Sequence, residues 1–306
     1  NYATELNELV KTAIADNITD DEKICVLLSG GLDSSIVTYI AKDLVENLSV
    51  FTAGVEGSED IFVSKKFTKL YNLDHTVVKI NLNDMLECLP DVIFALETFD
   101  AALIRSAVPM FLISKIIKEN QGDCVLLTGE GGDELFGGYN YLTDLRSNES
   151  LNQELINLLD IEHKTGLQRV DRIPYFFSIE ARAPLFDRRL VEFSFKIPPE
   201  LKIFYKKNIG IAKKWILRKA FENEIPDEFV WRKKQKFSYG VESQFLLKDH
   251  INKMITDIEF DEEKQIRPDF SVRSKEELYY WRIFRSKFKP TLDTISEIGI
   301  TSVFEL

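Results

Sequence analysis

Short apolar runs alternate with segments of helical periodicity over the first 140 residues of the chain. The run 24–28 is too short for a helix and ends at a glycine pair, which is typical of a buried strand. We therefore expect helices at 6–14, 34–44, 60–71 and 106–120, with strands at 24–28, 48–54, 76–80 and 124–127. Alternation of this kind predicts right-handed crossovers and an α/β fold, a parallel sheet with helices on both faces.

Strand patterns fade beyond residue 140, and helical periodicity takes over. The predicted helices lie at 151–159, 165–177, 188–196, 209–223, 241–257 and 274–288. The charged stretch 259–272 predicts a mobile loop. We expect an α/β core at 1–140 and a C-terminal helical part at 141–306 that completes the site.

The chain has 306 residues, of which 44% are hydrophobic, and a formal net charge of −11. This acidic balance disfavours a nucleic-acid partner, because a phosphate backbone needs a strong basic patch. Basic residues gather at 213–219 and 232–236, but both runs are short and favour a solvated face. No apolar run approaches ~18 residues, so a membrane partner is not expected.

The chain has three cysteines, Cys25, Cys88 and Cys124, without the CxxC spacing of a zinc site. An odd, sparse set also argues against a disulfide framework. Cys25 and Cys124 lie in predicted strands, where we expect small buried apolar side chains. This cysteine usage fits a reducing, cytoplasmic environment.

A first glycine loop, SGGLDSS at 29–35, follows the first predicted strand and opens a helix. Open α/β sheets bind ligands at this position. Glycines let backbone N–H groups approach a phosphate, and the helix N-terminus favours anionic oxygen. Asp33 in such a loop suggests a cation, and Mg²⁺ fits. The alternative is a glycine turn followed by an Asp/Ser helix cap.

A second glycine loop, GEGGDELFGGY at 129–139, follows the predicted strand 124–127. It contains five glycines and three carboxylates, a composition that suits neither a core nor an ordinary surface loop. Close approach of the backbone to a ligand, with carboxylates directed at a metal or a proton, explains it. The alternative is an irregular acidic turn.

The two glycine loops together resemble the paired signatures of the synthetase domain of asparagine synthetases. Further segments follow in the order of that family: ETFD at 97–100, EARAPLFD at 180–187 and WRKKQKFSYG at 231–240. The resemblance extends over roughly 5–290. It implies an α/β fold of the adenine nucleotide alpha hydrolase type, also called the PP-loop ATP-pyrophosphatase fold.

The resemblance implies that ATP lies across the two glycine loops. The residues that would hold it are Leu28, Ser29, Gly30, Gly31, Asp33, Ser34, Ser35, Ala53, Thr128, Gly129 and Asp133. Asp33 and Asp133 would share Mg²⁺ with the pyrophosphate. Two carboxylates from neighbouring strand ends are well suited to a metal that bridges phosphate oxygens.

Three further residues have implied roles in the reaction. Lys234 would stabilise charge at phosphorus; the alternative is one solvated lysine among its neighbours, but the spacing from Trp231 and Phe237 favours the catalytic role. Glu130 would support formation of the intermediate and take a proton from the attacking amine. Arg105 would bind a substrate carboxylate, or form a structural salt bridge instead. For Glu180 and Arg182 we expect an internal ion pair.

The implied reaction adenylates the side-chain carboxylate of aspartate, and ammonia then attacks the acyl-adenylate. Members of the family usually carry an N-terminal glutaminase domain, and 1–22 holds nothing of that kind. We therefore expect free ammonia, a separate glutaminase subunit or a missing glutaminase segment as the nitrogen source.

Several alternatives remain open from the sequence. Bulky residues at 174–177 suggest another acyl substrate, as in β-lactam-forming and peptide-cyclising relatives. A tRNA-modifying enzyme would use a similar ATP loop, but the acidic balance counts against it. A module that binds nucleotide without turnover is a further alternative, which the joint presence of Asp33, Glu130, Asp133 and Lys234 argues against.

Overall fold

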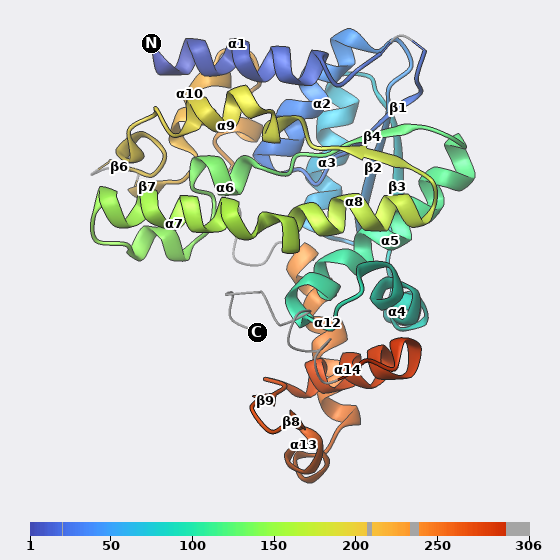
Figure 1. Ribbon diagram of the computed structural model, residues 1–306. Coiled ribbons are helices and arrows are strands. Elements are labelled where there is room, and N and C mark those ends of the chain that lie inside the picture. Colours follow the sequence, from blue (N-terminus) through green and yellow to red (C-terminus); the bar gives the residue numbers. More distant parts are fainter. Residues whose placement is uncertain (20, 207–209, 233–238, 292–306) are drawn as a thin grey trace.

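A five-stranded parallel sheet forms the centre of the molecule (Figure 1). The computed structural model describes residues 1–19, 21–206, 210–232 and 239–291. The strands run in the order β3-β2-β1-β4-β5. Their bounds are β1 Ile24–Leu27, β2 Ser49–Gly54, β3 Asp74–Lys79, β4 Val125–Leu127 and β5 Glu180–Arg182. Every neighbouring pair is parallel, as the sequence predicts.

Side chains of β1 alternate between two apolar layers, so helices cover both faces of the sheet. Val26 packs in one core with α1 (Tyr2–Ala15) and α2 (Leu32–Leu44). Cys25 faces the opposite side and packs with α5 (Ala101–Gln121). The continuous apolar run of the strand reflects this burial on both faces, and the predicted fold class is confirmed.

Most predicted helices are present with shifted ends. The other α-helices before residue 231 are α3 Glu59–Leu70, α4 Leu82–Leu96, α6 Gly132–Phe136, α7 Asn148–Ile161, α8 Gly166–Phe176, α9 Arg188–Ser194, α10 Trp215–Phe221 and α11 Asp227–Val230. Helix α4 was not predicted. Helix α5 begins five residues earlier than predicted, because the Asp100 carboxylate accepts a hydrogen bond from the Leu103 N–H at 2.8 Å and caps it.

The secondary structure differs from the prediction at 204–212 and at 257–271. The predicted helix 209–223 begins only at α10, because β6 (Phe204–Lys206) and β7 (Gly210–Ala212) form an antiparallel hairpin before it. The predicted mobile loop 259–272 instead forms α13 (Asp257–Glu263) and a hairpin of β8 (Gln265–Arg267) and β9 (Phe270–Ser271). A complete capping box between Thr256 and Glu259 starts α13.

A second apolar core joins the C-terminal helices to the sheet layer. Helices α12 (Tyr239–Met254) and α14 (Lys275–Phe288) pack against α4 and α5, and the hairpin of β8 (Gln265–Arg267) and β9 (Phe270–Ser271) lies beyond them (Figure 1). The Phe99 ring lies 5.2 Å from Trp281, centroid to centroid. Helix α14, predicted at 274–288, therefore belongs to the core.

The strand β5 comes from the second half of the chain, yet it pairs with β4 and completes the sheet. The boundary at residue 140 stays a prediction, since the sheet extends across it. Arg182 of β5 donates to Glu180 at 2.7 Å and to Glu22 at 2.8 Å, so the predicted internal ion pair is present.

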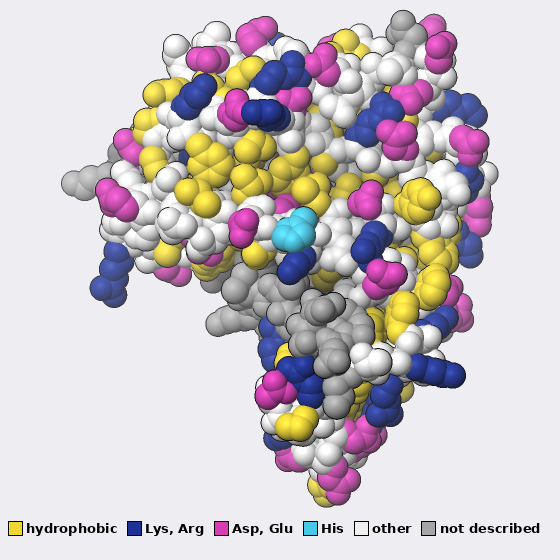
Figure 2. Space-filling model, viewed as in Figure 1, with side chains coloured by type: hydrophobic (Ala, Val, Ile, Leu, Met, Phe, Trp, Pro, Cys, Tyr) yellow, Lys and Arg dark blue, Asp and Glu magenta, His cyan; other side chains and the backbone are white. Residues whose placement is uncertain are grey.

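All three cysteines are free and buried. Acidic and basic side chains are interspersed over the described part of the face drawn in Figure 2, rather than gathered by sign. Among the residues that the structure describes, no helix has the length and apolar character needed to span a bilayer.

Candidate active site

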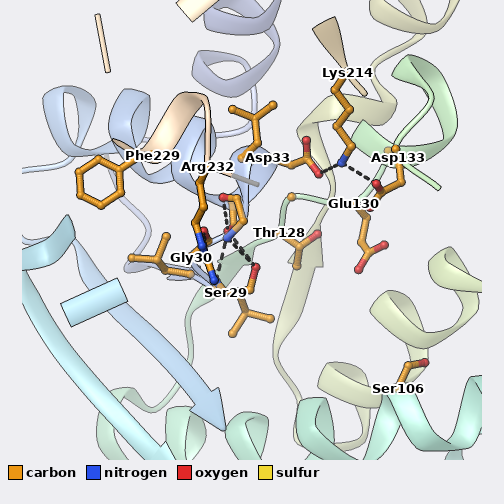
Figure 3. A pocket seen from close by; sticks show the side chains of 18 of the residues that line it. Ser29, Gly30, Asp33, Ser106, Thr128, Glu130, Asp133, Lys214, Phe229 and Arg232 are labelled. Atoms are coloured by element: carbon orange, nitrogen blue, oxygen red, sulfur yellow. Dashed lines mark hydrogen bonds and ion pairs between the residues drawn. The ribbon is translucent and has the colours of Figure 1, made fainter. Parts of the chain in front are cut away.

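A cavity of about 730 Å³ opens at the carboxyl ends of β1, β2 and β4 (Figure 3). Parallel sheets bind ligands at this edge. Both glycine loops line it, and so do residues of the second half of the chain on or next to β7, α8, α10 and α11. The cavity therefore collects the ends of three strands and several distant elements.

The first glycine loop joins β1 to α2, and hydrogen bonds hold it in place. The Ser29 N–H donates to Ser34 Oγ at 3.2 Å, and Ser34 Oγ donates to the Gly31 carbonyl at 3.2 Å. Gly31 is the N-cap of α2 and has no side chain to cap the first turn. The N–H groups at this helix end are thus available for an anion in the cavity.

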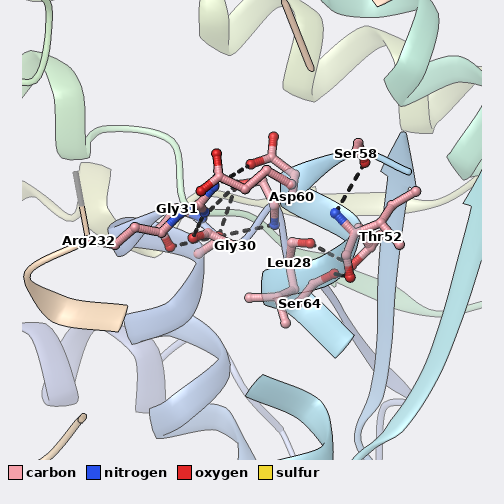
Figure 4. A network of polar contacts seen from close by, with 12 residues as sticks. Leu28, Gly30, Gly31, Thr52, Ser58, Asp60, Ser64 and Arg232 are labelled. Atoms are coloured by element: carbon pink, nitrogen blue, oxygen red, sulfur yellow. Dashed lines mark hydrogen bonds and ion pairs between the residues drawn. The ribbon is translucent and has the colours of Figure 1, made fainter. Parts of the chain in front are cut away.

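The side chain of Arg232 connects the first glycine loop to α3 (Figure 4). Its Nη1 donates to the Gly30 carbonyl at 2.7 Å, and its Nη2 lies 3.2 Å from Asp60 and 3.3 Å from Glu59 of α3. The guanidinium thus contacts two segments that each lie more than 170 positions before Arg232 in the sequence. The guanidinium also places a positive charge next to the first glycine loop, the candidate phosphate-binding segment.

Asp33 and Asp133 converge on one ammonium group, that of Lys214 (Figure 3). Lys214 Nζ lies 2.7 Å from Asp133 Oδ1 and also contacts Asp33 Oδ2. Because both carboxylates contact the same nitrogen atom, they lie close enough together to share one magnesium ion.

Glycines make room for these carboxylates. A Cβ at Gly132 would overlap the carboxyl group of Asp33. A Cβ at Gly138 would overlap Asp133 Oδ1 and lie against Lys214 Cε. The two glycines in the second loop are thus required by close packing around the carboxylate pair.

Lys214 is charged, although it is only 7% exposed. Burial lowers the pKa of its ammonium, but Asp133 and Asp33 outweigh this and raise it above the usual value. The sequence interpretation of 213–219 and 232–236 as solvated faces is therefore wrong for Lys214, and equally for Arg232, whose side chain is only 11% exposed. Both cations face the cavity because the chain after β7 folds back over the sheet edge.

Glu130 lies beside Asp133 and lines the same cavity (Figure 3). Its Oε1 forms an ion pair with Nη2 of Arg169, a residue of α8 that also lines the cavity. Sequence reasoning missed Arg169, because nothing in the periodicity of α8 separates it from a solvated arginine. Glu130 is thus held in a fixed orientation at the cavity wall, opposite the first glycine loop.

The other end of the cavity is apolar. Its wall is formed by side chains of β1, β2 and α5, namely Leu27, Leu28, Phe51, Ala53, Met110 and Ile113. Thr128 and Gly129 close it from the β4 side. An apolar slot next to a polar loop suits a flat heterocycle joined to an anionic group.

The structure brings together most of the predicted site residues. Those that line the cavity are Leu28, Ser29, Gly30, Gly31, Asp33, Ser34, Ala53, Thr128, Gly129, Glu130 and Asp133. Ser35 is 1% exposed and does not line the cavity. Lys234 lies outside the described residues.

Arg105 does not line the cavity, which favours the structural alternative for it. Its Nη1 lies 3.6 Å from Oε2 of Glu276 on α14, and Glu276 is fully buried. The Tyr280 hydroxyl donates to the same carboxylate at 2.9 Å. Arg105 thus links α5 to the C-terminal helix.

The bulky segment 174–177 does not form a wall of the cavity either. Tyr175 is 76% exposed and Phe176 is 41% exposed, at the end of α8. Phe176 and Phe177 instead pack on Phe111 of α5 in tilted and edge-on arrangements, at centroid distances of 5.2 and 4.7 Å. The bulkier substrate wall expected from these residues is therefore absent from the described cavity lining.

The donor set at Asp33 and Asp133 fits magnesium better than a transition metal. No group of three or more His, Cys, Asp or Glu side chains suited to a metal occurs among the residues that the structure describes. Magnesium commonly binds through one or two carboxylates, with phosphate oxygens and water completing its shell. Two converging carboxylates beside an anion-binding loop match this pattern.

Comparison with known proteins decides the family. The asparagine synthase family profile matches residues 5–156 and 143–282, which together cover most of the chain. The chain belongs to the asparagine synthase family. Two asparagine synthetases described as glutamine-hydrolyzing illustrate the similarity: number 2 of Lotus japonicus is 34% identical over 301 residues, and that of Rattus norvegicus is 34% identical over 304.

These asparagine synthetases are longer than the matched region. The alignments cover 93% and 95% of this chain but only 51% and 54% of the two relatives. The chain thus spans about half the length of the curated relatives it matches. Among solved structures, an NH3-dependent NAD synthetase from Campylobacter jejuni matches with TM-score 0.41 and 14% identity, over 93% of this chain and 94% of that one.

Proposed function

We propose that this chain catalyses ATP-dependent amide synthesis through an acyl-adenylate. A carboxylate oxygen of the acyl substrate, aspartate in the favoured case, attacks the α-phosphorus of ATP, and pyrophosphate leaves. Ammonia then attacks the acyl carbon, the C–O bond to AMP breaks, and the amide forms. Membership in the asparagine synthase family supports this carbon–nitrogen ligase chemistry.

The convergence of Asp33, Asp133 and Lys214 beside the first glycine loop is the observation that carries this proposal. The loop and the N-terminus of α2 offer N–H donors to phosphate oxygens, and Lys214 adds a buried cation. Asp33 and Asp133 would hold Mg²⁺, which when bound neutralises charge on the pyrophosphate. The apolar slot at Ala53 and Met110 would take the adenine.

The remaining residues act around the acyl group. Glu130 lies across the cavity from the first loop, where a carboxylate can take a proton from the attacking nitrogen. Arg169 holds Glu130 in place. Lys234, which lies outside the described residues, is proposed from the family resemblance as a further cation at the phosphorus.

The described site does not assign the source of nitrogen for this reaction. The curated relatives are described as glutamine-hydrolyzing, and about half of their length lies outside the match. We therefore propose that ammonia comes either free from solution or from a glutaminase domain or subunit. Aspartate is the acyl substrate proposed by analogy with these relatives.

An exchange assay tests the proposed function directly. Labelled pyrophosphate is incubated with protein, ATP, Mg²⁺ and one carboxylate at a time from a panel that includes aspartate, without any amine. We expect label to enter ATP with aspartate and not without a carboxylate, because adenylation is reversible. Exchange with another acid alone would replace aspartate as substrate, and no exchange with any acid would contradict the proposal.

A further inference from the structure

A buried carboxylate, Glu162, lies beside Glu130 and takes no part in the function proposed so far. It follows α7 in the chain and is only 4% exposed. Its Oε2 accepts a hydrogen bond from Thr165 at 2.8 Å. Its Oε1 has no hydrogen-bond partner within the described part of the chain, which is costly for a buried carboxylate oxygen.

The unpaired oxygen lies near the carboxylate of Glu130. A Cβ at Gly166 would overlap Glu162 Oε1 and lie 3.2 Å from Glu130 Oε2, so the two oxygens are close neighbours beside this glycine. One small donor between them can thus reach both oxygens with hydrogen bonds. Glycine at 166 lets the Glu162 carboxylate come this close to the backbone.

Carboxyl groups outnumber cations around Glu162. The titratable groups that face it are the carboxyl groups of Glu130 and Glu134, the guanidinium of Arg169 and the hydroxyl of Tyr139. Burial raises the pKa of Glu134 to about 8, so this group is largely protonated near neutral pH. Burial and the neighbouring Glu130 raise the pKa of Glu162 to about 7, the range in which a carboxylate exchanges protons at neutral pH.

We propose that the space between Glu130 and Glu162 is an ammonium-binding subsite, in which Glu162 holds the incoming cation and takes its first proton. This inference rests on the proposed function. Ammonium suits such a pair of oxygens, since it is about as small as a water molecule and can donate a hydrogen bond to each of them.

The proton balance of the reaction requires two acceptors. Ammonium must lose one proton before its lone pair can form the C–N bond to the acyl carbon. The electron pair of the broken C–O bond leaves with AMP, and the new amide sheds a second proton. Glu162 accepts the first of these protons and Glu130 the second, so each carboxylate acts once per turnover.

The test compares two nucleophiles in the Glu162→Gln variant. Hydroxylamine is already neutral near pH 7 and needs no deprotonation before attack, whereas ammonium does. We expect the KM for ammonium to rise about tenfold, as for loss of one charge-assisted hydrogen bond. The kcat/KM with hydroxylamine and the exchange of pyrophosphate into ATP should both stay near the wild-type values.

Two further variants complete the design. Gly166→Ala should give the same selective loss with ammonium, since its methyl group displaces the Glu162 carboxylate. Glu154→Gln, on α7 and hydrogen-bonded to Tyr141, is the matched control and should change neither nucleophile. An unchanged KM for ammonium in Glu162→Gln, or an equal loss with both nucleophiles, would overturn the subsite. Absence of exchange in the wild-type protein would instead overturn the proposed function, and the subsite with it.

Discussion

Replacing Lys214 by methionine is expected to slow pyrophosphate exchange into ATP by about 10²- to 10³-fold, as for removal of one preorganised charge at a transition state. The buried ammonium lies between Asp33 and Asp133, where the leaving pyrophosphate is proposed to gather charge. Methionine keeps the length and apolar stem of lysine, so the loss is one of charge rather than of packing.

The same variant should lose stability when no nucleotide is bound. Asp33 and Asp133 would then repel each other without their shared cation. We expect the free energy of unfolding to fall by about 2–3 kcal/mol, less than the ~3–5 kcal/mol of a fully buried pair because Asp133 is 35% exposed. Mg²⁺ with ATP should restore part of this loss in a thermal unfolding assay.

Lys219→Met is the matched control for Lys214→Met. Lys219 lies on α10 within five residues of Lys214 and pairs with Glu222 away from the two aspartates. The rate of pyrophosphate exchange into ATP in Lys219→Met should stay within about twofold of the wild-type rate, since partly exposed ion pairs contribute little. An exchange rate in Lys214→Met that equals the control would remove this lysine from the reaction.

Replacing Glu130 by glutamine should reduce amide formation by about 10²- to 10⁴-fold, the usual contribution of a general base. Glutamine keeps the shape of the side chain but cannot take a proton from the attacking nitrogen. Adenylation precedes this step, so the exchange of pyrophosphate into ATP should fall far less than amide formation does.

Rapid-quench measurements separate these two steps for Glu130→Gln. We expect AMP to remain bound as the acyl-adenylate, with amide appearing slowly afterwards. Glu149→Gln, on the exposed side of α7, should behave as the wild type. Equal losses of exchange and amide formation would instead assign Glu130 to adenylation.

The sequence predicts well those parts of the site that depend on short stretches of chain. Both glycine loops follow apolar strands, and the order of strands and helices places them at one edge of a parallel sheet. Asp33 and Asp133 therefore had to come close together, and the structure places both on one lysine. This much follows from local periodicity and from the handedness of crossovers.

Side chains that reach the site from distant segments could not be predicted. Lys214 lies 181 positions after Asp33, and Arg169 lies 39 after Glu130. Periodicity describes which face of a helix is apolar, but not which distant loop that face meets. Lys214 and Arg232 therefore looked like solvated charges, since a lysine or arginine buried by a carboxylate has no local signature.

The short strands escaped prediction for a related reason. β5 has only three residues, Glu180–Arg182, two of them charged, and its pairing with β4 comes from tertiary contact rather than strand propensity. The hairpin β6–β7 interrupts a stretch with helical periodicity in the same way. Glu162 was overlooked because its environment depends on the missing side chain of Gly166.

The central claim is that the acyl carboxylate becomes linked to AMP through one of its own oxygens. Oxygen-18 in the side-chain carboxylate of aspartate reports this directly, in a reaction with ATP, Mg²⁺ and ammonium analysed by mass spectrometry. The account predicts that AMP gains one heavy oxygen, because the amine breaks the bond between that oxygen and the acyl carbon. Unlabelled AMP formed alongside amide, or heavy oxygen in inorganic phosphate with ADP as product, would contradict it.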